Sequence, residues 1–391
     1  MLRCLTISAY ILGSAKAAFP KSVSISRSKS YRWRVIHDVS EVLSPDSDLL
    51  PLGGPYPMEA DGEEELVQAS FRGEFDGGGH TISGLQVDTT GRGQAAGLFG
   101  QLSSSDGNAG DVASIHDLTI ADSSFTGDGY VGAFVGIFRN YSVLENCVTA
   151  ETVTVASPEG RAGGVAGCAE GDETLLLRCA NYGTVSAEEA GGIAGIAGGY
   201  SYLVQCENYG TVTGDDAAGI LAVHSGSSYY DGLVIGCVNY GTVTASDGGS
   251  AFGIVAENGS TLRYNVNAGL VDGGESGEAF AIGKRDGDIA CCGNIGTVTC
   301  SDPYVYQFVC SWELGTYPEL SAEGLAKVYG WTKAETELTP VEASSAADGS
   351  LTSALQANDS YGYWTQGDAF PVWDGQGGLE EYDWLREQLG L

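Results

Sequence analysis

Short apolar runs separated by glycine, asparagine and acidic residues fill the chain from about residue 71 to residue 300. The runs are rich in β-branched and small apolar residues, a pattern that predicts strands and tight turns and not helices. Two kinds of run alternate. One is a small-residue phrase such as Gly191-Gly192-Ile193-Ala194-Gly195, and the other leads into a turn, as in Leu203-Val204-Gln205-Cys206-Glu207-Asn208.

The turn phrase repeats along the chain. Asn-Tyr-Gly-Thr-Val occupies residues 181–185, 208–212 and 239–243, and altered copies occupy 267–271 and 294–298. Successive asparagines are 27, 31, 28 and 27 residues apart. A repeat of this length indicates supersecondary units stacked on one another. The sequence therefore predicts an all-β fold, a right-handed parallel β-helix (β-solenoid) with an N-terminal cap and a mixed α/β C-terminal cap.

In such a stack, equivalent residues of successive coils lie above one another. We therefore expect two inward apolar columns. The first contains the valines of the repeated phrase: Val185, Val212, Val243, Val271 and Val298. The second contains the central residue of the small-residue phrase: Ile193, Ile220, Ile254 and either Ala281 or Ile282.

Four segments follow from these patterns. Residues 1–34 form a basic segment that is targeting-like or disordered, and residues 35–70 form the N-terminal cap, with a short helical turn within 59–69. Residues 71–300 hold the repeats. Residues 301–391 lose the period and form the C-terminal cap, for which helices are expected at 321–329 and 378–390.

Charge narrows the function classes. The chain has 51 acidic and 18 basic residues and a net charge of −33, which disfavours binding to nucleic acids and anionic membranes, because both need a basic footprint. Residues 1–34 carry seven basic residues and no acid, and Ala15-Lys16-Ala17 has the form of a signal cleavage site. A secretory signal, a transit-like peptide and an artefactual chain start all remain open. No other stretch has the roughly 20 apolar residues of a membrane span.

Three sets of residues recur in register with the turn phrase. The asparagines predict a structural stack, because an amide can hydrogen-bond along the ladder. The cysteines before the turn predict a column of buried thiols, since a column offers no point of convergence for a metal. The tyrosines should point outward and form the candidate ligand-binding row, and the alternative is that these rings only stabilise their cross-strand neighbours. These tyrosines are Tyr182, Tyr209 and Tyr240, and the cysteines are Cys147, Cys179, Cys206, Cys237 and Cys292.

No motif of catalysis or cofactor binding emerges. The four histidines are scattered without a zinc-peptidase pair, and the glycine-rich phrases do not open helices as phosphate-binding loops do. Asp76 and His80 flank three glycines, which we interpret as a tight structural corner. Cys300 and Cys310 could pair as a disulfide within the C-terminal cap. We therefore expect no catalytic residue, no cofactor and no metal.

The chain resembles bacterial GLUG-motif repeat proteins. Gly97-Leu98-Phe99-Gly100 matches the motif, and residues 75–85 and 115–118 are similar to the first coil of that group. The resemblance covers about residues 71–300. It implies a β-helix in secreted or surface proteins, and it supplies no catalytic residues to transfer.

Two functions from different classes fit these observations. The first is a non-enzymatic, monomeric repeat protein, extracellular or on the cell surface, that adheres to an extended glycan or a host surface protein. The second is a β-helix polysaccharide hydrolase or lyase, which needs convergent carboxylates or a basic residue in one groove. The scarcity of Lys and Arg in the repeats disfavours a lyase.

Overall fold

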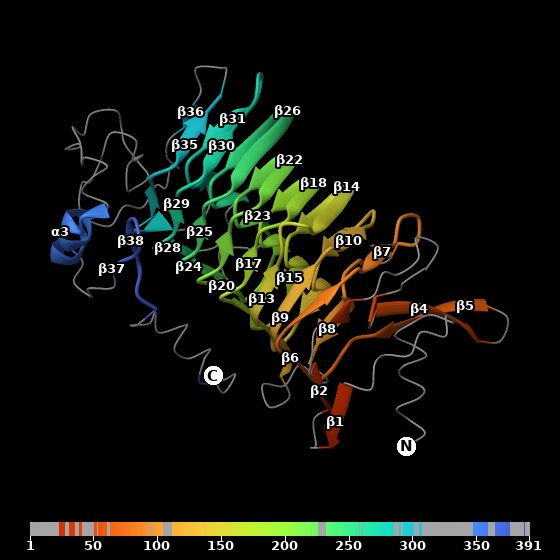
Figure 1. The fold of residues 1–391 in the computed structure, drawn as a ribbon. Coiled ribbons are helices and arrows are strands. Elements are labelled where there is room, and N and C mark those ends of the chain that lie inside the picture. The colour runs from red at the N-terminus through yellow and green to blue at the C-terminus, as the bar shows by residue number, and fades with distance from the viewer. Residues whose placement is uncertain are drawn as a thin grey trace.

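The protein is a β-solenoid of about 6 turns, which confirms the predicted parallel β-helix. The computed structural model describes residues 23–27, 31–35, 39–40, 51–52, 54–60, 63–93, 95–104, 112–225, 232–257, 259, 261–284, 289–290, 292–300, 305–306, 347–358, 364–375 and 387. Figure 1 shows the strands of successive coils stacked side by side along the rod. Each central coil passes through three sheets in the same order, so equivalent residues meet in register.

The first sheet receives two short strands from most coils. One of these strands lies just before the residue of the cysteine column, and the other lies just after it. Its strands are β6 (Glu74–Ser83), β9 (Ala113–Ala121), β13 (Ser142–Thr149), β16 (Thr174–Leu177), β17 (Ala180–Asn181), β20 (Ser201–Val204), β21 (Glu207–Asn208), β24 (Leu233–Ile235), β25 (Val238–Asn239), β28 (Thr261–Arg263), β29 (Val266–Asn267), β33 (Ile289–Ala290) and β34 (Gly293–Asn294).

The second sheet follows the turn phrase, and the third carries the small-residue phrase. The second sheet contains β7 (Gln86–Asp88), β10 (Ser124–Thr126), β11 (Tyr130–Gly132), β14 (Thr154–Gly163), β18 (Thr184–Gly191), β22 (Thr211–Ala218), β26 (Thr242–Phe252), β30 (Leu270–Asp272), β31 (Glu278–Phe280), β35 (Thr297–Thr299) and β36 (Val305–Tyr306). The third contains β8 (Phe99–Ser103), β12 (Val135–Arg139), β15 (Ala166–Glu170), β19 (Ala194–Ala197), β23 (Leu221–His224), β27 (Val255–Glu257) and β32 (Gly283–Lys284).

The described segments before the repeats also contain β strands. Strands β1 (Val23–Arg27) and β2 (Tyr31–Val35) form an antiparallel hairpin, and β2 and β3 (Val39–Ser40) pair with β6. Strands β4 (Gly54–Ala60) and β5 (Glu63–Ala69) form a second hairpin. The helical turn expected within 59–69 is therefore wrong, because backbone pairing with β4 outweighs a weak local preference.

The C-terminal elements lie against the side of the solenoid. They are helix α3 (Ser350–Asn358) and the antiparallel strands β37 (Trp364–Gln366) and β38 (Pro371–Trp373) (Figure 1). Their apolar side chains share a buried cluster with outward residues of the first sheet. The helices expected at 321–329 and 378–390 lie almost wholly outside the described residues, as does Cys310 with its expected disulfide. None of the described helices has the length and apolar character needed to cross a membrane.

Both expected apolar columns exist. The valines of the repeated phrase pair in register from Val155 through Val185, Val212, Val243 and Val271 to Val298. In the second column the backbone of Ile254 bonds to Ile282, so Ile282 and not Ala281 occupies the last position. All but Val298 are buried in the main core.

The asparagines form a buried amide ladder. The Nδ2 of each asparagine donates to the Oδ1 of the asparagine in the next coil. The distances are 2.9 Å for Asn181–Asn208, 2.8 Å for Asn208–Asn239, 2.8 Å for Asn239–Asn267 and 2.6 Å for Asn267–Asn294. The small-residue phrase of the third sheet passes close to this ladder. A Cβ atom on Gly192 would lie 2.0 Å from the carbonyl oxygen of Gly219 and 2.6 Å from Cγ of Asn208. The glycine is therefore required by close approach.

The cysteines form the expected buried column. Cys147, Cys179, Cys206 and Cys237 are fully buried, and each thiol donates to backbone carbonyl oxygens at about 3.5 Å. Burial raises the pKa of Cys179 and Cys237, which keeps these thiols protonated. At the position without cysteine, the Oδ1 of Asn265 accepts the backbone N–H of Cys237 at 2.9 Å.

The valine column should be intolerant of charge. We expect Val212→Asp to lower the free energy of unfolding by about 4 kcal/mol or more, because the carboxylate would be buried among apolar side chains. The matched control is Thr211→Asp on the neighbouring exposed position of β22, which should change stability by less than about 1 kcal/mol. Equal effects in urea unfolding would contradict the inward placement of Val212.

His224 gives the fold an acid-sensitive position. It is buried at the end of β23, opposite Ala197, and burial lowers its pKa to about 4. The pKa of His224 in the folded protein is lower than its ordinary value of 6.5. The stabilising contribution of the neutral ring is therefore complete above pH 6.5 and is lost as the pH falls through about 4. When the pH is lowered from 6.5 to about 4, the free energy of unfolding should fall by on the order of 3 kcal/mol more in the wild-type protein than in His224→Leu. Parallel stability–pH curves for the two proteins would contradict this.

Candidate functional site on the outer face of the first sheet

A column of left-handed residues marks the middle of the first sheet. In six successive coils of the described chain, one residue with a positive φ angle directly precedes the inward residue of the cysteine column and occupies an outward position. Asparagine, aspartate and glycine tolerate this conformation better than other residues do. The column, with its φ angles, is Asp117 (54°), Asn146 (51°), Arg178 (51°), Gln205 (51°), Gly236 (63°) and Tyr264 (57°).

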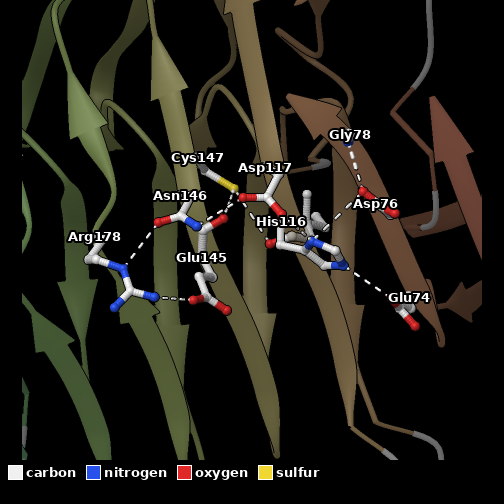
Figure 2. A network of polar contacts seen from close by, with 10 residues as sticks. Glu74, Asp76, Gly78, His116, Asp117, Glu145, Asn146, Cys147 and Arg178 are labelled. Carbon is white, nitrogen blue, oxygen red and sulfur yellow. Dashed lines mark hydrogen bonds and ion pairs between the residues drawn. The ribbon is translucent and has the colours of Figure 1, made fainter. Parts of the chain in front are cut away.

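The first three members of this column form a polar network (Figure 2). Asn146 Nδ2 donates to Asp117 Oδ1 at 2.9 Å, and Arg178 Nε donates to Asn146 Oδ1 at 3.2 Å. The Arg178 guanidinium also pairs with Glu145. Three neighbouring coils are thereby joined by side chains as well as by backbone.

His116 extends the network to the first coil. Its Nδ1 lies 2.9 Å from Asp117 Oδ2 and 3.9 Å from Asp76 Oδ1, and its Nε2 lies 3.1 Å from Glu74 Oε1. Burial alone would lower the pKa of His116, but hydrogen bonds to Asp117 and Glu74 and the nearby carboxylate charges outweigh it and raise this pKa. Within the part of the chain that the structure describes, Asp76, His116 and Asp117 are the group whose ligand atoms converge, all within 4.8 Å.

The C-terminal segment covers the other end of the column. Gly236 has no side chain, and the indole of Trp373 lies where one would be: a Cβ there would be 2.5 Å from Trp373 Cε3. Trp364 packs edge-on against Tyr264, with ring centroids 5.4 Å apart. The outer face of the first sheet is therefore polar at one end and covered by aromatic side chains at the other.

The predicted tyrosine row is a continuous stack. The ring centroids of Tyr182 and Tyr209 are 4.5 Å apart with an interplanar angle of 2°, and those of Tyr209 and Tyr240 are 4.6 Å apart at 6°. Tyr182 and Tyr209 are each 38% exposed. Tyr240 is half-buried because Phe370 packs against it at 5.8 Å. The row thus presents two of its three rings to solvent.

Stacking determines which parts of the rings a ligand can reach. The faces of Tyr209 are covered by its neighbours, so the row exposes ring edges and hydroxyl groups. Ala150 occupies the position of Tyr182 in the preceding coil, since Thr149 pairs with Asn181, so the row of rings does not continue into that coil. The Tyr209 hydroxyl donates to Glu207 at 3.0 Å, and burial together with that carboxylate raises the pKa of Tyr209.

Sequence reasoning found the tyrosine row but missed the histidine network. It associated Asp76 with His80, whereas the strand register places Asp76 opposite His116 and His80 opposite Leu118. The left-handed column was also missed. The sequence did contain a signal for this column. In three coils an Asp, Asn or Gly, residue types that tolerate a positive φ angle, directly precedes the inward residue.

Comparison with known proteins gives one partial similarity. Over 153 residues the chain is 31% identical to halomucin from Haloquadratum walsbyi. The aligned region covers 39% of this chain and 2% of halomucin. The chain thus spans only a small fraction of that relative. No protein-family model and no solved structure matches the chain.

The docking of the C-terminal segment should depend on Gly236. In Gly236→Ala the methyl group would displace Trp373, so we expect faster proteolysis around residues 364–375 and a red-shifted tryptophan emission, with the solenoid intact by far-UV circular dichroism. Gly248→Ala is the matched control, because Gly248 also has a positive φ (80°) but has no atom within 4 Å of an added Cβ. Backbone strain of about 1 kcal/mol is common to both variants. Identical proteolysis rates would contradict the close fit of Trp373 over Gly236.

Proposed function

We propose that this is a non-enzymatic repeat protein of the GLUG type, located outside the cell or on its surface, that binds an extended ligand through the tyrosine row. The acidic rod, its repeats and the partial similarity to halomucin support this location. We further propose that it acts as a monomer, without inserting into a membrane or binding nucleic acid.

The observation that carries the proposal is the exposed stack of Tyr182 and Tyr209. Exposed aromatic side chains with polar tips are typical of binding surfaces. The stack places an identical ring edge and hydroxyl at each coil, about 4.5 Å apart, so it suits a ligand that runs along the rod and offers repeated hydroxyl groups. An extended glycan has this chemistry. A surface protein of a host is the second ligand class.

The alternative function is hydrolysis or elimination on a polysaccharide. A lyase requires a basic side chain with access to the substrate, and three arginines of the repeats, Arg139, Arg161 and Arg178, each pair with a glutamate of a neighbouring coil. The carboxylates around His116 are the described group most relevant to a hydrolase. Release of reducing ends from a polysaccharide by the wild-type protein would favour this alternative.

Removing the two exposed rings should weaken binding without unfolding the rod. We expect the double variant Tyr182→Ser/Tyr209→Ser to bind immobilised mucin glycans at least about tenfold more weakly, a loss of about 1.4 kcal/mol. Tyr240→Ser should have a smaller effect, because Phe370 already covers that ring.

Leu270→Ser is the control, since Leu270 is equally exposed, at 37%, but lies on the second sheet. Circular dichroism establishes that each variant is folded. If the double variant binds as wild type does, the rings only shield the turn and the site lies elsewhere.

A further inference from the structure

We propose that Asp76, His116 and Asp117 form a binding site for a divalent first-row transition metal ion of the Zn²⁺ class. Each residue offers one ligand atom, and the three atoms lie within 4.8 Å of one another. Two atoms bound to one Zn²⁺ at about 2.1 Å are separated by about 3–4 Å. The distances from His116 Nδ1 to Asp117 Oδ2 (2.9 Å) and to Asp76 Oδ1 (3.9 Å) match this separation.

The contacts of the imidazole support metal binding through Nδ1. Nε2 faces Glu74 at 3.1 Å, and Nδ1 faces the two aspartates (Figure 2). A metal-binding histidine commonly donates its other ring N–H to a carboxylate, which fixes the tautomer and the ring orientation. Glu74 is placed to accept the Nε2 proton, and this leaves the Nδ1 lone pair directed at the space between the aspartates.

The aspartates are held by groups outside the ligand set. Asn146 Nδ2 donates to Asp117 Oδ1 at 2.9 Å, and the backbone N–H of Gly78 donates to Asp76 Oδ1 at 2.8 Å. A register shift between Asp76 and His80 in β6 lies opposite Asp117. A Cβ on Gly77 would lie 2.3 Å from the Asp117 carbonyl oxygen, so glycine allows the two strands to approach at this point.

The ligand types define the class of ion. Imidazole nitrogen with carboxylate oxygen suits Zn²⁺, Co²⁺, Ni²⁺ or Mn²⁺, whereas Ca²⁺ and Mg²⁺ prefer oxygen ligands throughout. The ligand side chains are 13%, 22% and 46% exposed for Asp76, His116 and Asp117, so water can complete the coordination. The acidic surface raises the local concentration of cations. Because Asp76 belongs to one coil and His116 to the next, a bound ion would cross-link the first two coils.

The test is titration of the full chain with Zn²⁺ after removal of metal with a chelator, followed by calorimetry and by thermal unfolding. We expect one Zn²⁺ per chain and a rise in the unfolding temperature on saturation. Co²⁺ should give the visible absorption of a nitrogen and oxygen site, without the intense charge-transfer band of thiolate ligands. Ca²⁺ should produce no comparable change.

Four variants test the roles of the individual side chains. His116→Gln and Asp117→Asn should abolish stoichiometric binding, and asparagine keeps the left-handed conformation at 117. Glu74→Gln should weaken it by about tenfold, as removal of an outer carboxylate does. Glu145→Gln is the control, because Glu145 belongs to the network but contacts Arg178 and is not a ligand. No Zn²⁺ uptake by wild type, or uptake unchanged in His116→Gln, would overturn the proposal, since the histidine would then serve only as an ion-pair partner.

Discussion

The buried amide ladder is the interaction on which the rest of the solenoid depends. An amide withdrawn from water without partners costs several kcal/mol, so each asparagine requires its neighbours in place. Besides its ladder bond, the Oδ1 of Asn208 accepts the backbone N–H of Gly210 at 3.3 Å, which fixes the turn that follows. A slip of one residue between coils would leave these amides unpaired. The ladder therefore fixes the register of the coils from Asn181 to Asn294.

The fold could be predicted from the sequence because the ladder leaves a regular trace. Asparagine, glycine and valine recur at fixed positions in each coil, and the valine and isoleucine columns follow from stacking alone. The hairpin β4–β5 could not be predicted in this way, since its pairing is not repeated and its glutamates resemble a helical segment. The choice of Ile282 over Ala281 is decided by a backbone bond to Ile254, and it agrees with the 28-residue step from Asn239 to Asn267.

The site was harder to predict than the fold. The tyrosines belong to the repeated phrase, so their row was visible, but its partial coverage by Phe370 comes from a segment outside the repeats. His116 and Glu74 are 42 residues apart and belong to coils of irregular length. Their proximity follows only from the register of β6 and β9. The left-handed column of the first sheet runs from a polar end at Asp117 to an end at Gly236 and Tyr264 that aromatic side chains cover.

The ladder also has a beginning and a direction. In the three coils directly before Asn181, the position of the ladder is occupied by Ile82, Ile120 and Thr149 in chain order. The Thr149 hydroxyl donates to Asn181 Oδ1 at 2.6 Å. Threonine thus joins an apolar stack to an amide stack. Every interior asparagine, by contrast, meets the same donor on one side and the same acceptor on the other. A gene duplication that copied one whole interior coil would continue the ladder with every amide still paired. The rod could thus lengthen by interior coils without a new kind of hydrogen bond in the ladder.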